Sequence, residues 1–148
     1  MSLRDRILND TKEAMRAKER DRLKLLRSLS AAIKQKEVDD QTTLGDAEIT
    51  AVVEKQVKQR RDAEEQFREG GREDLAEQEA RQAEILAEYL PEALDPAELD
   101  QLIDQAIESA GARSMQDMGK VMGALKPQVQ GRADMSEVSN RVKSRLGS

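Results

Sequence analysis

The residues with the most distinctive chemistry are glycines and cations near the C-terminal end of the sequence. Gly119 and Gly123 lie inside a helical pattern, where each glycine costs about 1 kcal/mol relative to alanine. We therefore predict that both positions serve close helix packing or the close approach of another backbone. Basic side chains flank and follow these glycines, and we predict that they contact nucleic-acid phosphates: Lys120, Lys126, Arg132, Arg141, Lys143 and Arg145.

The same cations also have a purely structural interpretation. Glu137, Arg141 and Arg145 follow one another at the spacing of an exposed ion-pair ladder along one helix. Asp134 is expected to cap the start of that helix, where its carboxylate would repel a phosphate. The sequence alone leaves both interpretations open.

The sequence lacks the side chains on which most self-sufficient active sites depend. It contains no histidine and no cysteine, so the commonest general base near neutral pH and all thiolate chemistry are excluded. The carboxylates and lysines do not group into a catalytic set. We therefore predict that the protein is not an enzyme and that it has no metal site and no cofactor.

Charge is distributed unevenly along the chain. The net charge is +5 over residues 1–37, −14 over residues 38–111 and +4 over residues 112–148. Basic ends around an acidic middle favour self-association or a polyanionic partner. The only aromatic residues, Phe67 and Tyr89, lie outside the basic tail, so base stacking is not available there. Any RNA would be recognised by its shape and its backbone.

The elements that must position these residues are helices throughout, because apolar residues recur at helical spacing and no stretch alternates with period two. In the N-terminal part we predict helices over residues 2–16, 19–38, 46–69 and 72–89. The last two should form a long hairpin closed by Gly70 and Gly71. In the first helix, four side chains are expected to face inward: Leu3, Ile7, Leu8 and Met15.

Arg60 and Arg61 interrupt the apolar face of the third predicted helix. We expect them to form ion pairs with the acidic fourth helix, and a second anion contact is the alternative.

A second module is predicted after a short linker, which divides the chain into residues 1–90 and 91–148. Its first helix has clear start signals, since Asp95 can act as N-cap and Pro96 occupies the first helical position. Gly111 should close this helix. We expect the next helix to be capped by Ser114 with Asp117 and ended by Pro127, and the last to be capped by Asp134 with Glu137.

Two stretches together resemble the GatB/YqeY family. They are KQVKQRRDAEEQFREGGREDLAEQEARQAEILAEYLP, Lys55 to Pro91, and SMQDMGKVMGALKPQVQGRAD, Ser114 to Asp134. The N-terminal part of that family is similar to LKLLRSLSAAIKQKE, Leu23 to Glu37. The resemblance implies an all-α, multihelical fold, with a larger N-terminal helical subdomain that contains a long hairpin and a C-terminal three-helix bundle.

The resemblance also implies a partner. The C-terminal module is similar to the tail of the B subunit of tRNA-dependent amidotransferases, which is understood as a tRNA-contacting element. We therefore expect the partner to be tRNA or another structured RNA. The alternative is a protein–protein interaction module that does not bind RNA, with a protein partner in the translation apparatus. A carbon–nitrogen ligase label with glutamine as amido donor would be inherited from multidomain relatives, because the amidase Ser-Ser-Lys constellation is missing here.

The start of the sequence, MSLRDRILND, has no apolar signal-peptide core. No run of residues approaches the roughly 18 apolar residues that span a bilayer. We therefore expect a cytoplasmic protein without a membrane partner.

Overall fold

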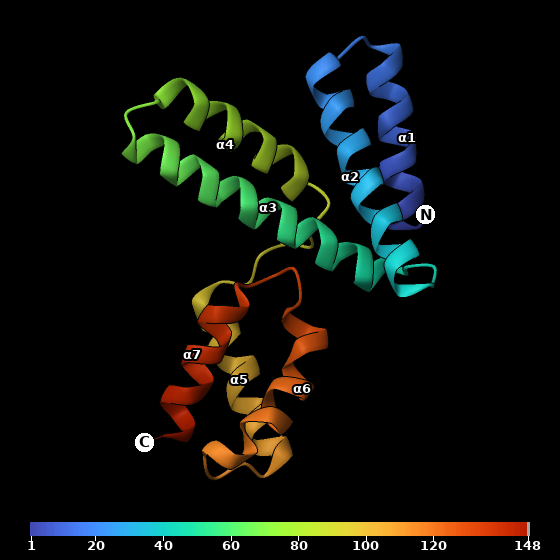
Figure 1. Ribbon diagram of the computed structural model, residues 1–148. Coiled ribbons are helices and arrows are strands. Elements are labelled where there is room, and N and C mark those ends of the chain that lie inside the picture. Colours follow the sequence, from blue (N-terminus) through green and yellow to red (C-terminus); the bar gives the residue numbers. More distant parts are fainter. Residues whose placement is uncertain (148) are drawn as a thin grey trace. The chain divides into compact units, whose positions relative to one another are not determined.

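The computed structural model describes residues 1–147, and these residues form seven α-helices, a short 3₁₀ turn and no β-strand (Figure 1). The all-α prediction is therefore confirmed. The chain divides into two compact units, Met1–Leu90 and Pro91–Ser148, although Ser148 itself lies outside the described residues. None of the helices in the described part is long and apolar enough to cross a membrane.

The N-terminal unit consists of two helical hairpins. The first pairs α1 (Leu3–Arg16) with α2 (Arg20–Asp40), and the second pairs α3 (Asp46–Glu69) with α4 (Glu73–Ala87). Local signals set these limits. The Ser2 hydroxyl accepts a hydrogen bond from the Asp5 amide at the start of α1, and the Gly45 amide donates to the Glu48 carboxylate at the start of α3 (3.1 Å). At the turn of the second hairpin, Gly71 has φ +75°, which favours glycine.

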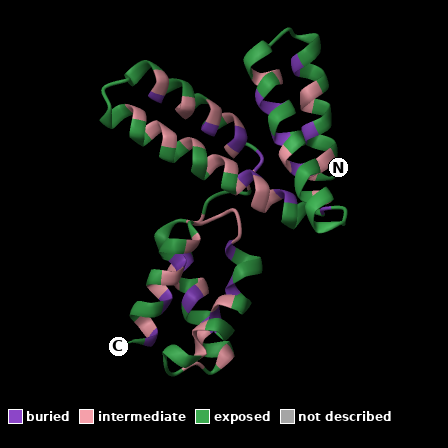
Figure 2. Cartoon of the chain, in the orientation of Figure 1, coloured by how far each residue is buried: buried purple, intermediate pink, exposed green. Residues whose placement is uncertain are grey.

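The core of this unit joins both hairpins, and buried positions line the inner sides of the helices (Figure 2). Tyr89 closes its edge: the phenol is buried and donates to the Asp10 carboxylate (2.6 Å), and the Arg6 guanidinium lies 4.9 Å from the ring centroid. The Glu37 carboxylate holds the loop after α2 by accepting from the Leu44 amide (2.8 Å). The fully buried large side chains of the unit are Ile7, Leu26, Leu29, Ile49, Val53 and Leu86.

Three helices make the C-terminal unit: α5 (Pro96–Ala110), α6 (Met118–Val129) and α7 (Met135–Leu146), with the 3₁₀ turn η1 (Met115–Asp117) before α6. The Asp95 carboxylate caps α5 by accepting from the Glu98 amide (2.8 Å), and Gly111 ends it with φ +63°. The three helices enclose one apolar core: Leu99, Ile103, Ala106, Val121, Leu125, Val129, Val138, Val142 and Leu146.

The inward face of α1 was predicted wrongly in part. Leu8 and Met15 are half exposed, at 50% and 53%. Ala14 is buried instead, at two helical turns from the buried Ile7. The buried stripe of α1 is therefore narrower than the apolar pattern of its sequence.

The limits of α6 were also predicted wrongly. Pro127 lies inside the helix, which continues to Val129. A proline in the last turn removes a single hydrogen bond, to the carbonyl of Gly123, so its cost falls on the end of the helix and not on its middle. Ser114 makes no side-chain capping hydrogen bond. The Asp117 carboxylate instead accepts a hydrogen bond from the Arg113 amide (3.0 Å).

Candidate nucleic-acid interface

The structure separates the predicted phosphate contacts into two groups. Arg132, Arg141 and Arg145 are only partly exposed and bind other groups of the same unit. Lys120, Lys126 and Lys143 are exposed and form no ion pair with any described residue. The sequence predicted all six as one cluster, and in the structure only the three lysines are both exposed and without an ion pair to a described residue.

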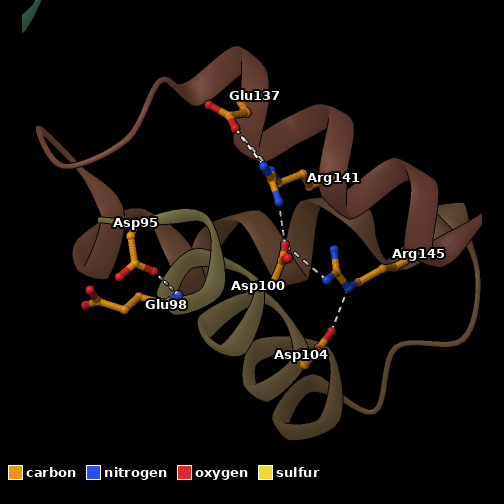
Figure 3. A network of polar contacts seen from close by, with 7 residues as sticks. All are labelled: Asp95, Glu98, Asp100, Asp104, Glu137, Arg141 and Arg145. Carbon is orange, nitrogen blue, oxygen red and sulfur yellow. Dashed lines mark hydrogen bonds and ion pairs between the residues drawn. The ribbon is translucent and has the colours of Figure 1, made fainter. Parts of the chain in front are cut away.

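The paired arginines lie on α7 and face α5 (Figure 3). Arg141 donates to the Asp100 carboxylate (2.7 Å) and, one turn back on α7, to Glu137 (2.9 Å). Arg145 contacts the same Asp100 oxygen (3.1 Å) and donates to Asp104 (2.6 Å). Three carboxylates therefore surround two guanidinium groups, and this network carries one net negative charge.

The electrostatics of this network stabilise its ionised form. The hydrogen bond from Arg141 holds the pKa of Asp100 below its ordinary value, with a smaller contribution from Arg145. The same contact with Asp100, followed by that with Glu137, raises the pKa of Arg141. A phosphate would compete with Asp100 for both arginines. For these two residues, the ion-pair interpretation describes the structure.

Asp100 and Asp104 were not singled out in the sequence, although a signal existed. They are spaced one helical turn apart on α5, just as Arg141 and Arg145 are on α7. An acidic pair and a basic pair with the same spacing can form ion pairs where two helices pack together. The sequence does not show that α5 and α7 pack together, because the residues in contact are 41 positions apart.

Arg132 holds the chain between Val129 and α7. Its Nε donates to the carbonyl of Glu92 (2.9 Å), and its own carbonyl accepts from the Leu94 amide (2.9 Å). This residue thereby fastens the segment before α5 to the α6–α7 connection. Its predicted phosphate contact would use only the part of the guanidinium that points away from Glu92.

The outward face of α6 is centred on Gly123. At 100° per residue, Gly119 lies about 40° to one side of it, and Lys120 and Lys126 lie about 60° to either side. All four residues are exposed, whereas Val121, Leu125 and Val129 are buried on the opposite side. The sequence of α6 contains no acidic residue. We call the surface formed by Gly119, Lys120, Gly123 and Lys126 the α6 face.

Close packing of helices does not explain the two glycines. A Cβ at Gly119 or Gly123 would meet no described atom within 4 Å, apart from its chain neighbours and the backbone of its own helix. Their φ angles lie outside the left-handed region, so alanine would fit the backbone as well. Neither glycine therefore packs closely against another helix of the C-terminal unit. The other prediction, the close approach of an external backbone, remains.

Comparison with known proteins identifies the family. The family described as Yqey-like protein matches residues 4–146. The chain belongs to this YqeY family. It is also similar to "Altered inheritance of mitochondria protein 41, mitochondrial" of Pyrenophora tritici-repentis (strain Pt-1C-BFP), with 32% identity over 147 residues, which cover 96% of this chain and 80% of that relative. Neither the family description nor the relative's name indicates a reaction.

Arg60 and Arg61 on α3 are also engaged within this YqeY-family protein. Arg60 pairs across the hairpin with Glu79 on α4 (3.4 Å), as predicted. Arg61 pairs with Glu64 on its own helix (3.0 Å), which differs from the prediction. Glu64 also binds Arg68 (2.7 Å), and the hydrogen bonds from Arg68 and then Arg61 lower the pKa of Glu64. Arg60 and Arg61 are therefore both held in ion pairs.

Proposed function

We propose that this YqeY-family protein is a non-enzymatic accessory protein that binds structured RNA, with tRNA as the RNA class. The α6 face is the contact surface, and Lys143 on α7 is an additional cation. A cytoplasmic location and a role beside aminoacylation or transamidation belong to the same proposal. The observation that carries it is an exposed helix face that combines two glycines, two unpaired lysines and no carboxylate.

The chemistry of the α6 face fits a nucleic-acid backbone. Lysine supplies a point charge to a phosphate without selecting a base. The glycines between the lysines carry no side chain, so a sugar–phosphate chain can lie against the helix backbone while both ammonium groups reach it. The C-terminal unit contains no aromatic residue, which excludes base stacking as the source of affinity. Recognition would depend on the shape and charge of a folded RNA.

This mode of binding predicts a steep but bounded dependence on salt. Each phosphate neutralised contributes a slope of about −0.7 to −0.9 in a plot of log K against log salt concentration. Two or three lysine contacts therefore give a total slope of roughly −1.5 to −2.5. Full participation of all six predicted cations would give a slope of about −4 or steeper.

The test is the binding of fluorescently labelled tRNA by the full chain, followed by anisotropy at several KCl concentrations. The substitutions Lys120→Glu and Lys126→Glu, made together, should weaken binding strongly and flatten the salt slope by about 1.5. A matched control makes the same charge change at Lys34 and Lys55, which are exposed and unpaired in the N-terminal unit. Equal losses in both variants, or no tRNA binding at low salt, would refute the proposal.

A further inference from the structure

In the N-terminal unit the two hairpins diverge at α2 and α4 (Figure 1). A polar cleft lies between these two helices. Two adjoining hollows of about 710 and 250 Å³ form it, and they share Asp21, Gln78 and Gln82. The larger hollow is within the range of small-molecule sites, roughly 300–1,000 Å³. The α6 face contributes nothing to this cleft, because all lining residues belong to α2, α3, α4 and the residue before α2.

The cleft concentrates cations that have no partner. Arg20 and Lys24 on α2 and Arg81 on α4 line it, are exposed, and make no ion pair or side-chain hydrogen bond with any described residue. Asp21 is the one lining carboxylate in the described chain without an ion pair. The uncommitted charge is therefore +2, in a unit whose 18 basic and 21 acidic side chains give it a net negative charge.

The other charged lining residues are already neutralised. Arg22 lies 3.5 Å from Glu88 and 4.0 Å from Glu19, and Arg60 lies 3.4 Å from Glu79. These pairs fix the walls of the cleft and remove the carboxylates that would otherwise compete for Arg20, Lys24 and Arg81. An anion entering the cleft meets three available cations and one available carboxylate.

Gln82 gives the cleft a second, independent feature, a hydrogen-bond acceptor without a donor in the described part of the chain. Its side chain lines both hollows. Among the described residues, its Oε1 is the one buried side-chain oxygen or nitrogen that has no hydrogen-bond partner. Folded proteins rarely leave such an acceptor unsatisfied, and each case calls for an explanation. Because the terminal torsion of glutamine is broad, the orientation of this amide is not fixed by its rotamer alone.

We propose that this cleft binds a nucleotide unit. Its phosphate is held by Arg20, Lys24 and Arg81, and a hydroxyl or amino group of its sugar or base donates to Gln82 Oε1. A nucleotide fits because it joins an anion to a hydrogen-bond donor at the scale of the larger hollow. A free mononucleotide and a nucleotide within an RNA chain share this chemistry. The proposal does not depend on RNA binding by the C-terminal unit.

The test is a titration of the ¹⁵N-labelled full chain with 5′-AMP, 5′-GMP, inorganic phosphate and a short single-stranded RNA, followed by amide chemical shifts. The mononucleotides should shift amides of α2 and α4 around Asp21 and Gln82, and bind at least about tenfold more tightly than phosphate. Binding by the RNA but not by the mononucleotides would support the site with an RNA chain as its source.

Two variants address the two halves of the site. Arg20→Glu with Arg81→Glu should reduce affinity at least about tenfold, because both guanidinium contacts become repulsive. The matched control is Lys34→Glu with Lys55→Glu, which makes the same charge change away from the cleft. Gln82→Met keeps the length of the side chain and removes its acceptor, so it should weaken nucleotides severalfold and leave phosphate binding unchanged. Thermal unfolding of each variant confirms that it is folded.

Several results would overturn the proposal. The first is the absence of shifts in α2 and α4, and the second is phosphate binding as tightly as a nucleotide. The third is an equal loss of affinity in the matched control. An acidic peptide that binds more tightly than the nucleotides, and whose binding depends on Arg20 and Arg81, would identify a protein segment as the occupant of the cleft. That result would equally refute the nucleotide assignment.

The double variant Lys120→Glu with Lys126→Glu separates this site from the α6 face. It should lose tRNA binding and keep the nucleotide-induced shifts in α2 and α4.

Discussion

Replacing Gly119 and Gly123 by alanine should stabilise the C-terminal unit while weakening its RNA binding. Both glycines are exposed and helical. A Cβ at either position would meet no described atom within 4 Å, apart from its chain neighbours and the backbone of its own helix, so alanine adds no clash. Alanine is favoured over glycine in a helix by about 1 kcal/mol per site. The double variant should therefore gain about 2 kcal/mol in the free energy of unfolding of this unit.

The composition of the chain allows this gain to be assigned to one unit. Both aromatic residues, Phe67 and Tyr89, lie in the N-terminal unit, so intrinsic fluorescence follows that unit alone, whereas far-ultraviolet circular dichroism follows the helices of both. In urea, the dichroism transition of the double variant should move to higher denaturant concentration and the tyrosine transition should remain in place. Hydrogen exchange of α6 peptides should slow in parallel.

Affinity for RNA should change in the opposite direction. Two methyl groups would separate the helix backbone from the phosphate chain, so tRNA binding should weaken severalfold despite the higher stability. Ala124→Gly is the matched control, since Ala124 is exposed on α6 about 100° from Gly123; it should lose about 1 kcal/mol of stability and retain its RNA affinity. Unchanged tRNA affinity in the double alanine variant would refute close approach, and lower stability would refute the reading of the glycines as unpacked.

Two further predictions concern the polar contacts of the two units. Asp100→Asn removes the carboxylate that both Arg141 and Arg145 bind. Because the pKa of Asp100 is lowered on folding, the stability that its carboxylate contributes is complete above the ordinary aspartate pKa of about 3.9 and is lost as the pH falls below it. An acid titration followed by circular dichroism should therefore show a weaker pH dependence of stability in the variant than in the unmodified chain. Tyr89→Phe removes the hydrogen bond to Asp10 and should lower the free energy of unfolding by about 1–2 kcal/mol, measured in urea by circular dichroism. Burial, together with Asp10, raises the pKa of the Tyr89 phenol, so the stability that the phenol contributes is complete below about pH 10 and is lost at higher pH. This loss at high pH should be missing in the variant.

Much of the local structure could be predicted because short-range chemistry decides it. The start of α3 after Gly45 and that of α5 at Pro96 follow from capping groups within a few residues. Gly111 ends α5 because its positive φ suits glycine. The predictions were wrong where the type of a single residue was taken to decide its burial or the end of a helix. Leu8 is apolar yet exposed, and Pro127 is tolerated because it lies in the last turn of α6.

The candidate site was predictable in composition but not in geometry. The sequence identified the cations of the C-terminal unit, whereas the structure showed that Arg141 and Arg145 are held by Asp100 and Asp104 while Lys120 and Lys126 remain exposed. The cleft between α2 and α4 had no signal in the sequence. Its residues come from helices far apart in the chain, and none of them forms a motif.

The sequence by itself determined the helices, the family, and the absence of histidine and thiol chemistry, because these depend on residue type and on spacing within a few turns. The tertiary structure decided which charges are available to a ligand. Whether an arginine is paired depends on the carboxylate that a distant helix brings to it, and the packing of α5 against α7 fixes that partner. The same packing left the α6 face exposed, and the divergence of two hairpins opened the cleft.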